Sequence, residues 1–140
     1  QFYHRDAPWG HVYNDVQTTP DAVARSVRKK KGQPAHMGSI EHTPYQSEDG
    51  GPRIMRSVIS MRSVHGRAIH PTEKPAALLE ILIKTSCPRG GLVGDFFAGS
   101  GAGGEAAAMA SRDNLGCELD PAMADLARAR LSGHLFAGVA

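Results

Sequence analysis

The 140-residue sequence has little cysteine and no long apolar run, and both absences narrow the class of protein. Its two cysteines, Cys87 and Cys117, give neither a disulfide framework nor the spacing of metal ligands, so no metal is expected. We expect a reducing, cytoplasmic compartment. No apolar run approaches the roughly 20 residues of a membrane span, and there is no signal-peptide pattern, so no membrane contact is expected.

Charge is distributed unevenly along the chain, although the formal net charge is only +2. Residues 1–75 hold 11 Lys and Arg against 7 Asp and Glu, whereas residues 76–140 hold 5 against 7. Six of the seven histidines also lie in the first part. This tilt favours a polyanion on the N-terminal side. The run from Arg28 to Lys31 either contacts phosphates or forms a solvated loop, and the sequence leaves both open.

Helix and strand patterns alternate over residues 70–132, whereas residues 1–53 are irregular and frequent in Gly, Pro, His, Gln and Ser. The expected elements are a strand over 54–61, a helix over 75–85, a strand over 92–96, a helix over 101–111, a strand over 114–119 and a helix that Asp120 caps and Pro121 opens. This order predicts an α/β fold with parallel strands and crossover helices. The expected core-facing side chains of the first and last helices are Leu78, Leu79, Leu82, Ile83, Met123, Leu126, Ala127 and Leu131.

The most informative segment is residues 95–104, which read Asp-Phe-Phe-Ala-Gly-Ser-Gly-Ala-Gly-Gly. An acid ends a short apolar run, a tight glycine turn follows, and an Ala-rich helical stretch comes next. A second acid, Glu118, ends another short apolar run 23 residues after Asp95. Strand, glycine loop, helix, strand and acid make up the first half of a nucleotide-type cofactor site.

The surroundings of the glycines decide which cofactor fits. Gly99, Gly101 and Gly104 satisfy the GxGxxG pattern, but Asp95 stands four residues before the first glycine, where a carboxylate would repel a pyrophosphate. S-adenosylmethionine carries an ammonium and a sulfonium instead, and Glu118 is placed to accept its ribose hydroxyls. No Lys-Ser/Thr pair follows the glycines, which excludes a P-loop. A nicotinamide or flavin site, and a glycine turn that only packs helix on strand, stay open as alternatives.

The segment from His70 to Pro75 reads His-Pro-Thr-Glu-Lys-Pro, and its two prolines fix a rigid entry into the following helix. Taken alone, this spacing indicates a helix N-terminal turn and nothing more. The segment nevertheless precedes Asp95 by some 20 residues, on the element that feeds the glycine strand. It could therefore reach the same cofactor.

Three motifs in order now become recognisable: His70 to Pro75, then Asp95 to Gly101, then Gly116-Cys117-Glu118-Leu119-Asp120. Together they resemble the S-adenosylmethionine-dependent DNA methyltransferases of bacteria and phages that modify exocyclic amino groups of adenine or cytosine. The resemblance covers roughly Arg53 to Leu131. It implies part of a Rossmann-like methyltransferase sheet, preceded by an irregular N-terminal segment.

The resemblance also implies roles for particular residues. Four residues would close over the methionine moiety of the cofactor: His70, Thr72, Lys74 and Pro75. Five would line the methionine end of the site and the sheet edge: Asp95, Phe96, Ala98, Gly99 and Gly101. Glu118 would bind the ribose. The strand from Arg53 to Met61 would enter the first motif. Residues 1–52 would be the tail of the region that reads double-stranded DNA, and 53–140 the cofactor-binding part.

The chain departs from the family pattern most clearly in having no Pro-Pro pair, because the family's catalytic motif is Asp, Asn or Ser followed by Pro-Pro and an aromatic. Asp6-Ala7-Pro8-Trp9 is the one candidate, with Asp6, Pro8 and Trp9 as catalytic residues. It lies only 64 residues before His70, which is short for a recognition domain. Otherwise Trp9 belongs to the recognition region, and the catalytic motif lies on a missing N-terminal half or a partner subunit.

The expected function is site-specific methylation of an exocyclic amino group of a DNA base, with adenine favoured over cytosine, by what is expected to be a fragment of a restriction-modification type methyltransferase. Such enzymes hold the amino hydrogens so that the lone pair points at the methyl group, on a base flipped from the duplex. The alternative is a non-catalytic DNA-binding or partner module that keeps the fold. A fragment should expose a sheet edge and an apolar face, and should be marginally stable or self-associating.

Overall fold

The computed structural model describes residues 5–27 and 45–135, and its contacts divide the chain into two compact units. One unit is residues 16–57, and the other combines residues 1–15 with 58–140. The first 15 residues therefore belong with the C-terminal unit, and the division falls at 57/58 where the sequence placed it at 52/53. The basic run from Arg28 to Lys31 lies outside the described residues.

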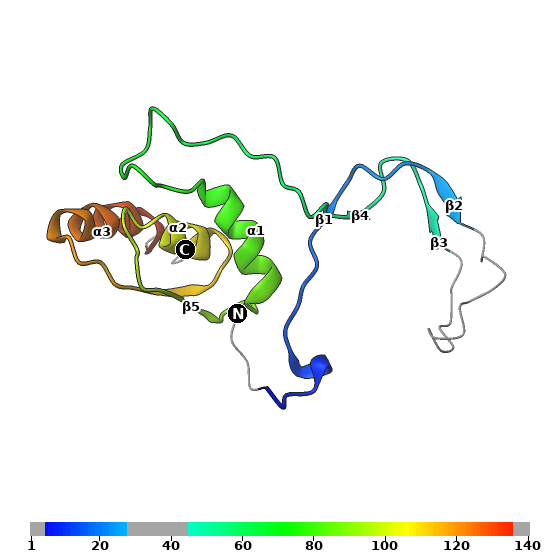
Figure 1. Ribbon diagram of the computed structural model, residues 1–140, viewed down its shortest axis with the longest axis horizontal. Coiled ribbons are helices and arrows are strands. Elements are labelled where there is room, and N and C mark those ends of the chain that lie inside the picture. Colours follow the sequence, from blue (N-terminus) through cyan, green and yellow to red (C-terminus); the bar gives the residue numbers. More distant parts are fainter. Residues whose placement is uncertain (1–4, 28–44, 136–140) are drawn as a thin grey trace. The chain divides into compact units, whose positions relative to one another are not determined.

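The smaller unit consists of two short antiparallel pairs (Figure 1). Its pairs are β1 (Thr18–Thr19) with β4 (Arg53–Ile54), and β2 (Arg25–Val27) with β3 (Tyr45–Ser47). The guanidinium of Arg53 donates two hydrogen bonds to the carboxylate of Asp21, from Nε to Oδ1 at 3.2 Å and from Nη2 to Oδ2 at 2.6 Å. That ion pair ties the two ends of the unit together.

The strand expected over residues 54–61 is wrong, because β4 ends at Ile54. Its antiparallel partner β1 is only two residues long, so the pairing reaches no further than Ile54 opposite Thr18. The N–H of Met55 still donates to the carbonyl of Gln17 at 2.9 Å, but no described strand pairs with the residues that follow.

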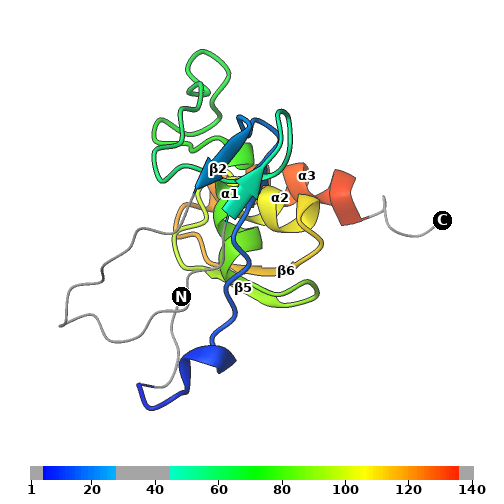
Figure 2. The same ribbon diagram turned by 90° about the vertical axis from the view of Figure 1, so that its right-hand side faces the viewer.

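The larger unit is a β-α-β arrangement with helices on one side of a parallel strand pair (Figures 1 and 2). Its elements are α1 (Ala76–Ser86), β5 (Leu92–Asp95), α2 (Ala102–Met109), β6 (Asp113–Gly116) and α3 (Pro121–Leu135). Strands β5 and β6 pair in parallel from Leu92 opposite Asp113 to Asp95 opposite Gly116. The expected parallel pair joined by a crossover helix is confirmed, whereas a full Rossmann-like sheet is not seen in the described residues.

The core lies where α2 meets α1 and the strand pair, and it is built mainly from alanine. Ala106, Ala107 and Ala110 are buried together with Ile83 of α1, and Val93 of β5 packs against them. Small side chains let the helix backbones approach closely, but they bury little apolar area each. The core is accordingly small, as expected for a unit of this size.

The last helix begins as the sequence predicts. Asp120 Oδ1 accepts a hydrogen bond from the backbone N–H of Ala122 at 2.9 Å, and Pro121 is the first helical residue. Ala127 is buried, but Leu126 and, on α1, Leu82 are exposed, contrary to expectation. No described element covers either side chain.

The side of the strand pair away from the helices is uncovered. Leu92 and Leu115 point to the same side, because Leu92 pairs with Asp113 and side chains alternate along each strand. They are 64% and 61% exposed, while Val93 points to the other side and packs against the core. Two exposed leucines on one face of a sheet, with Asp113 beside them, favour association.

We expect the isolated chain to self-associate through this surface at micromolar concentration. Replacing Leu92 and Leu115 with Gln should shift its sedimentation toward monomer, while Val23→Gln, a comparably exposed change in the other unit, should not. A chain that sediments as a monomer and unfolds in one sharp, high-temperature transition would contradict the expectation.

Glycine is required at residue 101, where the turn after β5 becomes α2. Gly101 has φ of 79°, and a Cβ there would lie 3.0 Å from Cβ of Ala127 on α3. Gly90 has a similar φ of 73° but open space around it. Substitutions at Gly90 and Gly101 therefore distinguish the cost of backbone strain from the cost of a clash with α3.

Accordingly, Gly90→Ala should lower the free energy of unfolding by about 1 kcal/mol, from the left-handed backbone alone. Gly101→Ala should lower it by roughly 1–3 kcal/mol more, because α3 must also shift. Urea denaturation of both variants measures the difference, and equal losses would show that α3 does not press on the glycine turn.

Candidate functional site

A cavity of about 340 Å³ lies at the end of the strand pair where β5 and β6 finish. Its wall is made by three segments that are separate in the sequence. They are His70, Thr72, Glu73 and Lys74; Asp95, Phe97, Ala98, Gly99, Ser100, Ala102 and Gly103; and Glu118. The carboxyl ends of parallel strands are where ligands bind in α/β folds.

Asp95 is held at this end by the strand pairing and by the start of α2. Its backbone carbonyl accepts the N–H of Cys117 at 2.8 Å, and its Oδ1 accepts the N–H of Phe97 at 3.1 Å. A Cβ at Gly103 would lie 2.5 Å from Asp95 Oδ2, so only glycine lets the carboxylate rest against the first turn of α2. The amino end of a helix favours a negative charge in that place.

Glu118 fastens the glycine turn to the start of α3. Its Oε2 accepts the N–H of Gly99 at 2.7 Å, and its Oε1 accepts the N–H of Asp120 at 2.9 Å. The hydrogen bonds from Asp120 and Gly99 lower the pKa of Glu118 below its ordinary value. The carboxylate therefore stays ionised, and each oxygen keeps a lone pair for a ligand hydroxyl.

The turn from His70 to Lys74 forms the opposite wall. The backbone N–H of Thr72 donates to His70 Nδ1 at 3.3 Å, which leaves the proton of the neutral ring on Nε2. The ammonium of Lys74 donates to the carbonyl of Thr72 at 2.9 Å. A Cβ at Gly99 would lie 3.8 Å from the His70 ring, so this wall and the glycine turn are in ordinary contact.

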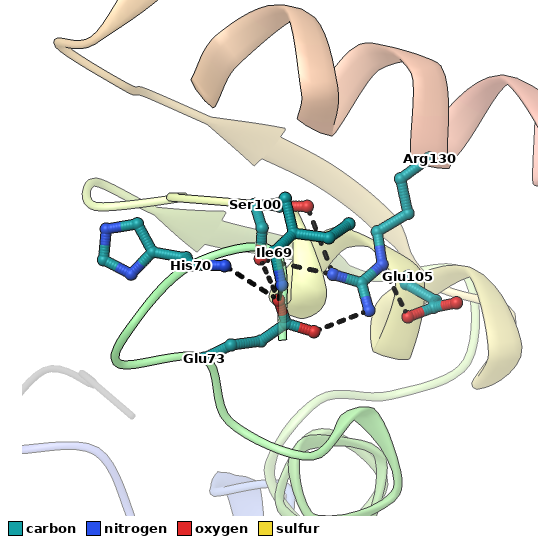
Figure 3. Close-up of polar contacts among 6 residues, drawn as sticks. All are labelled: Ile69, His70, Glu73, Ser100, Glu105 and Arg130. Carbon is teal, nitrogen blue, oxygen red and sulfur yellow. Dashed lines mark hydrogen bonds and ion pairs between the residues drawn. The ribbon is translucent and has the colours of Figure 1, made fainter. Parts of the chain in front are cut away.

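Behind the wall lies an ion-pair cluster that sequence reasoning missed (Figure 3). Glu73 Oε1 accepts from Arg130 at 2.9 Å, and Glu73 Oε2 accepts from the hydroxyl of Ser100 at 2.8 Å. Burial alone would raise the pKa of Glu73, but hydrogen bonds from Arg130, Ser100 and Ile69 and the charge of Arg130 outweigh it and lower the pKa to about 2. The sequence held one local sign of this cluster, because Arg130 stands directly before Leu131, a residue expected to face the core.

The cofactor residues expected from the sequence fall in two groups. Those that line the cavity are His70, Thr72, Lys74, Asp95, Ala98, Gly99 and Glu118, whereas Pro75, Phe96 and Gly101 flank it within the same segments. Glu73, Phe97 and Ser100 also line it and lie within the predicted segments, although no separate role was predicted for them; Ala102 and Gly103 line it from beyond those segments.

The structure does not bring Asp6, Pro8 and Trp9 to the cavity, whose lining among the described residues comes from 70–118. Trp9 begins a short 3-10 helix, Trp9–His11, and Asp6 is exposed beside Arg5 at 3.5 Å. The segment that follows attaches at the far end of α1, where the N–H of Asp15 donates to the carbonyl of Thr85 at 3.0 Å. Helix α1 is 11 residues, so that end lies roughly 16 Å from its start beside the cavity.

Two comparisons with known proteins agree with this geometry. A family model described as DNA methylase, for the N6 and N4 methyltransferases, matches residues 2–129. The crystal structure of the M1.HpyAVI–SAM complex is 30% identical over the matched part, with a TM-score of 0.50. The match covers 56% of this chain and 38% of that one, so the chain spans well under half the length of its structural neighbour.

Among the described residues, no helix combines the length and the apolar character needed to cross a bilayer. The family match extends over most of the 140 residues and includes the three motifs whose side chains meet at the cavity. The chain therefore belongs to the DNA methylase family, the S-adenosylmethionine-dependent enzymes that methylate amino groups of DNA bases.

Proposed function

We propose that this chain binds S-adenosylmethionine in the cavity at the ends of β5 and β6 and is the cofactor-binding part of a DNA amino-methyltransferase. The observation that carries the proposal is the convergence of Asp95, Glu118 and the His70 to Lys74 turn on one cavity of about 340 Å³. Small-molecule sites commonly have volumes of roughly 300–1,000 Å³ with a few convergent polar groups.

The donor set fits this molecule better than a dinucleotide. Asp95 is an acid at the glycine turn, where a pyrophosphate would be repelled and an ammonium or sulfonium attracted. Glu118 keeps its charge and has lone pairs for two adjacent hydroxyls. When bound, S-adenosylmethionine would supply an electrophilic methyl group, and the residues of this chain would hold and orient it.

The base is proposed to be methylated on its exocyclic amino group, with adenine as the first substrate to test. In that role residues 16–57 would be the tail of the target-recognition region, where Arg25 and Arg56 are exposed cations available to phosphates. A bacterial restriction-modification setting and a cytoplasmic location are part of the same proposal.

A non-catalytic module that keeps the fold is the second candidate. It is favoured by the absence of any Pro-Pro pair and by the position of Asp6 and Pro8 away from the lining of the cavity. On this proposal, the chain binds cofactor and DNA, while the groups that hold the amino hydrogens lie on other sequence.

The first test is cofactor binding by isothermal titration. The chain should bind S-adenosylmethionine and not NAD, and Asp95→Ala should weaken that affinity by about tenfold or more, since a buried charge contact is worth about 1.4 kcal/mol or more. Asp113→Ala is the matched control, because Asp113 is an acid at the opposite end of the strand pair and outside the cavity. Retained affinity in Asp95→Ala would contradict the proposal.

The second test is transfer of labelled methyl groups to unmethylated DNA. We expect this chain alone to bind cofactor without incorporation, and incorporation to require sequence that carries the Pro-Pro-aromatic motif. Incorporation by the chain alone that is lost in Asp6→Ala would instead make Asp6 to Trp9 the catalytic motif.

A further inference from the structure

We propose that Arg130 is a positioning residue for the cofactor site, which it shapes by clamping the His70 to Lys74 turn onto the glycine turn. The inference rests on the proposed function and adds a residue that lies outside every motif of the site. Arg130 is near the end of α3, 57 residues from Glu73 along the chain. It is absent from the lining of the cavity, so it acts through its partners.

Glu73 is the point at which the turn is held. Its side chain is only 3% exposed, and its Oε2 accepts from the backbone N–H of Ile69 at 2.9 Å and of His70 at 3.4 Å. The same carboxylate receives the hydroxyl of Ser100 and the guanidinium of Arg130. The carboxylate of Glu73 thus accepts hydrogen bonds from the start of the His70 to Lys74 turn, from the glycine turn and from α3.

The guanidinium of Arg130 binds three segments of the chain at once. Its Nε donates to Glu105 of α2 at 2.9 Å, and another guanidinium nitrogen donates to the carbonyl of Ser100 at 3.3 Å and to its hydroxyl at 3.2 Å. The third nitrogen binds Glu73. Figure 3 shows the guanidinium placed between the two carboxylates, with Ser100 beside it.

The clamp lies at the seam between the two walls of the cavity. Glu73 belongs to one wall and Ser100 to the other, and the Arg130 guanidinium binds both from the side of α3. Ser100 is 2% exposed, so its contacts with the clamp are shielded from water. Releasing the guanidinium should let the His70 to Lys74 turn move away from the glycine turn.

Arginine is needed rather than any cation. A guanidinium presents its donors in a fixed planar fork, which can bridge two carboxylates and a serine at once. A lysine ammonium at residue 130 keeps the charge, but it is a point donor and cannot span Glu73 and Glu105 in the same way. The clamp also pairs Glu73 internally, so the charged side chains that the cavity wall offers to a ligand are Asp95, Glu118 and Lys74.

The test compares two ligands, S-adenosylmethionine and 5′-methylthioadenosine, which keeps the adenosine but lacks the amino-acid end. Arg130→Gln and Arg130→Lys should weaken binding of S-adenosylmethionine about tenfold or more, because the turn that closes over the methionine end is released. Binding of 5′-methylthioadenosine, which relies on the Glu118 side, should change less than about threefold. Loss of folding alone would weaken both ligands equally.

Arg128→Gln is the matched control on the same helix. Within the described part of the chain, Arg128 pairs with Asp125 alone, at 2.6 Å, and its side chain is 76% exposed. Its replacement should leave both affinities at wild-type values. If Arg130→Gln does not fold, Arg130→Lys and Ser100→Ala decide the question, since each keeps most of the side-chain volume.

A pH readout tests the clamp without any ligand. Because the pKa of Glu73 is lowered from 4.5 to about 2, its contribution to stability is complete above about pH 4.5 and is lost as the pH falls toward about 2. The difference in free energy of unfolding between wild type and Glu73→Gln should therefore be largest near neutral pH and shrink below about pH 4.5.

The outcomes separate the clamp from the proposed function. If the wild-type chain binds S-adenosylmethionine and the Arg130 variants bind it equally well, or lose both ligands in equal measure, the clamp is overturned while the cofactor assignment stands. If the wild-type chain binds neither ligand, the proposed function fails, and the positioning role fails with it.

Discussion

The structure depends on how closely α2 can lie against the strand pair. The residues of α2 that face its neighbours are Gly103, Gly104, Ala106 and Ala107, and a side chain at either glycine would meet Asp95, Asn114 or Leu131. Close approach brings the amino end of the helix to the carboxylate that ends β5. It also lets α1 and α3 both pack against the same helix.

The electrostatics of the cavity follow from this packing. Three carboxylates reach its wall, and the chain compensates one of them internally through Arg130. Glu118 is ionised because two backbone N–H groups hold it, which also fixes the direction of its remaining lone pairs. With two such acids against the single ammonium of Lys74, the wall favours a cationic ligand group over a phosphate.

The sequence predicted the parts of the fold that are encoded locally. The apolar runs ending at Asp95 and Glu118, the glycines between them and the Asp120 cap each act within a few residues, and the parallel pair with its crossover helix followed from their order. The prediction of a strand beyond Ile54 was wrong because a strand forms beside a partner strand, and a local sequence pattern carries no information about that partner. The expected burial of Leu82 and Leu126 was wrong for a related reason, because burial depends on which elements cover a helix.

The pairing of Glu73 with Arg130 could not be predicted, since neither residue carries information about another 57 positions away. It has a consequence for the order of events during synthesis. All described residues that line the cavity have been made once residue 118 is complete, yet the cation that ties its walls together comes 12 positions later. A nascent chain that has emerged only through residue 118 holds the described cavity-lining residues without Arg130. If Arg130 acts as the proposed clamp, tight capture of the cofactor would follow the docking of the last helix.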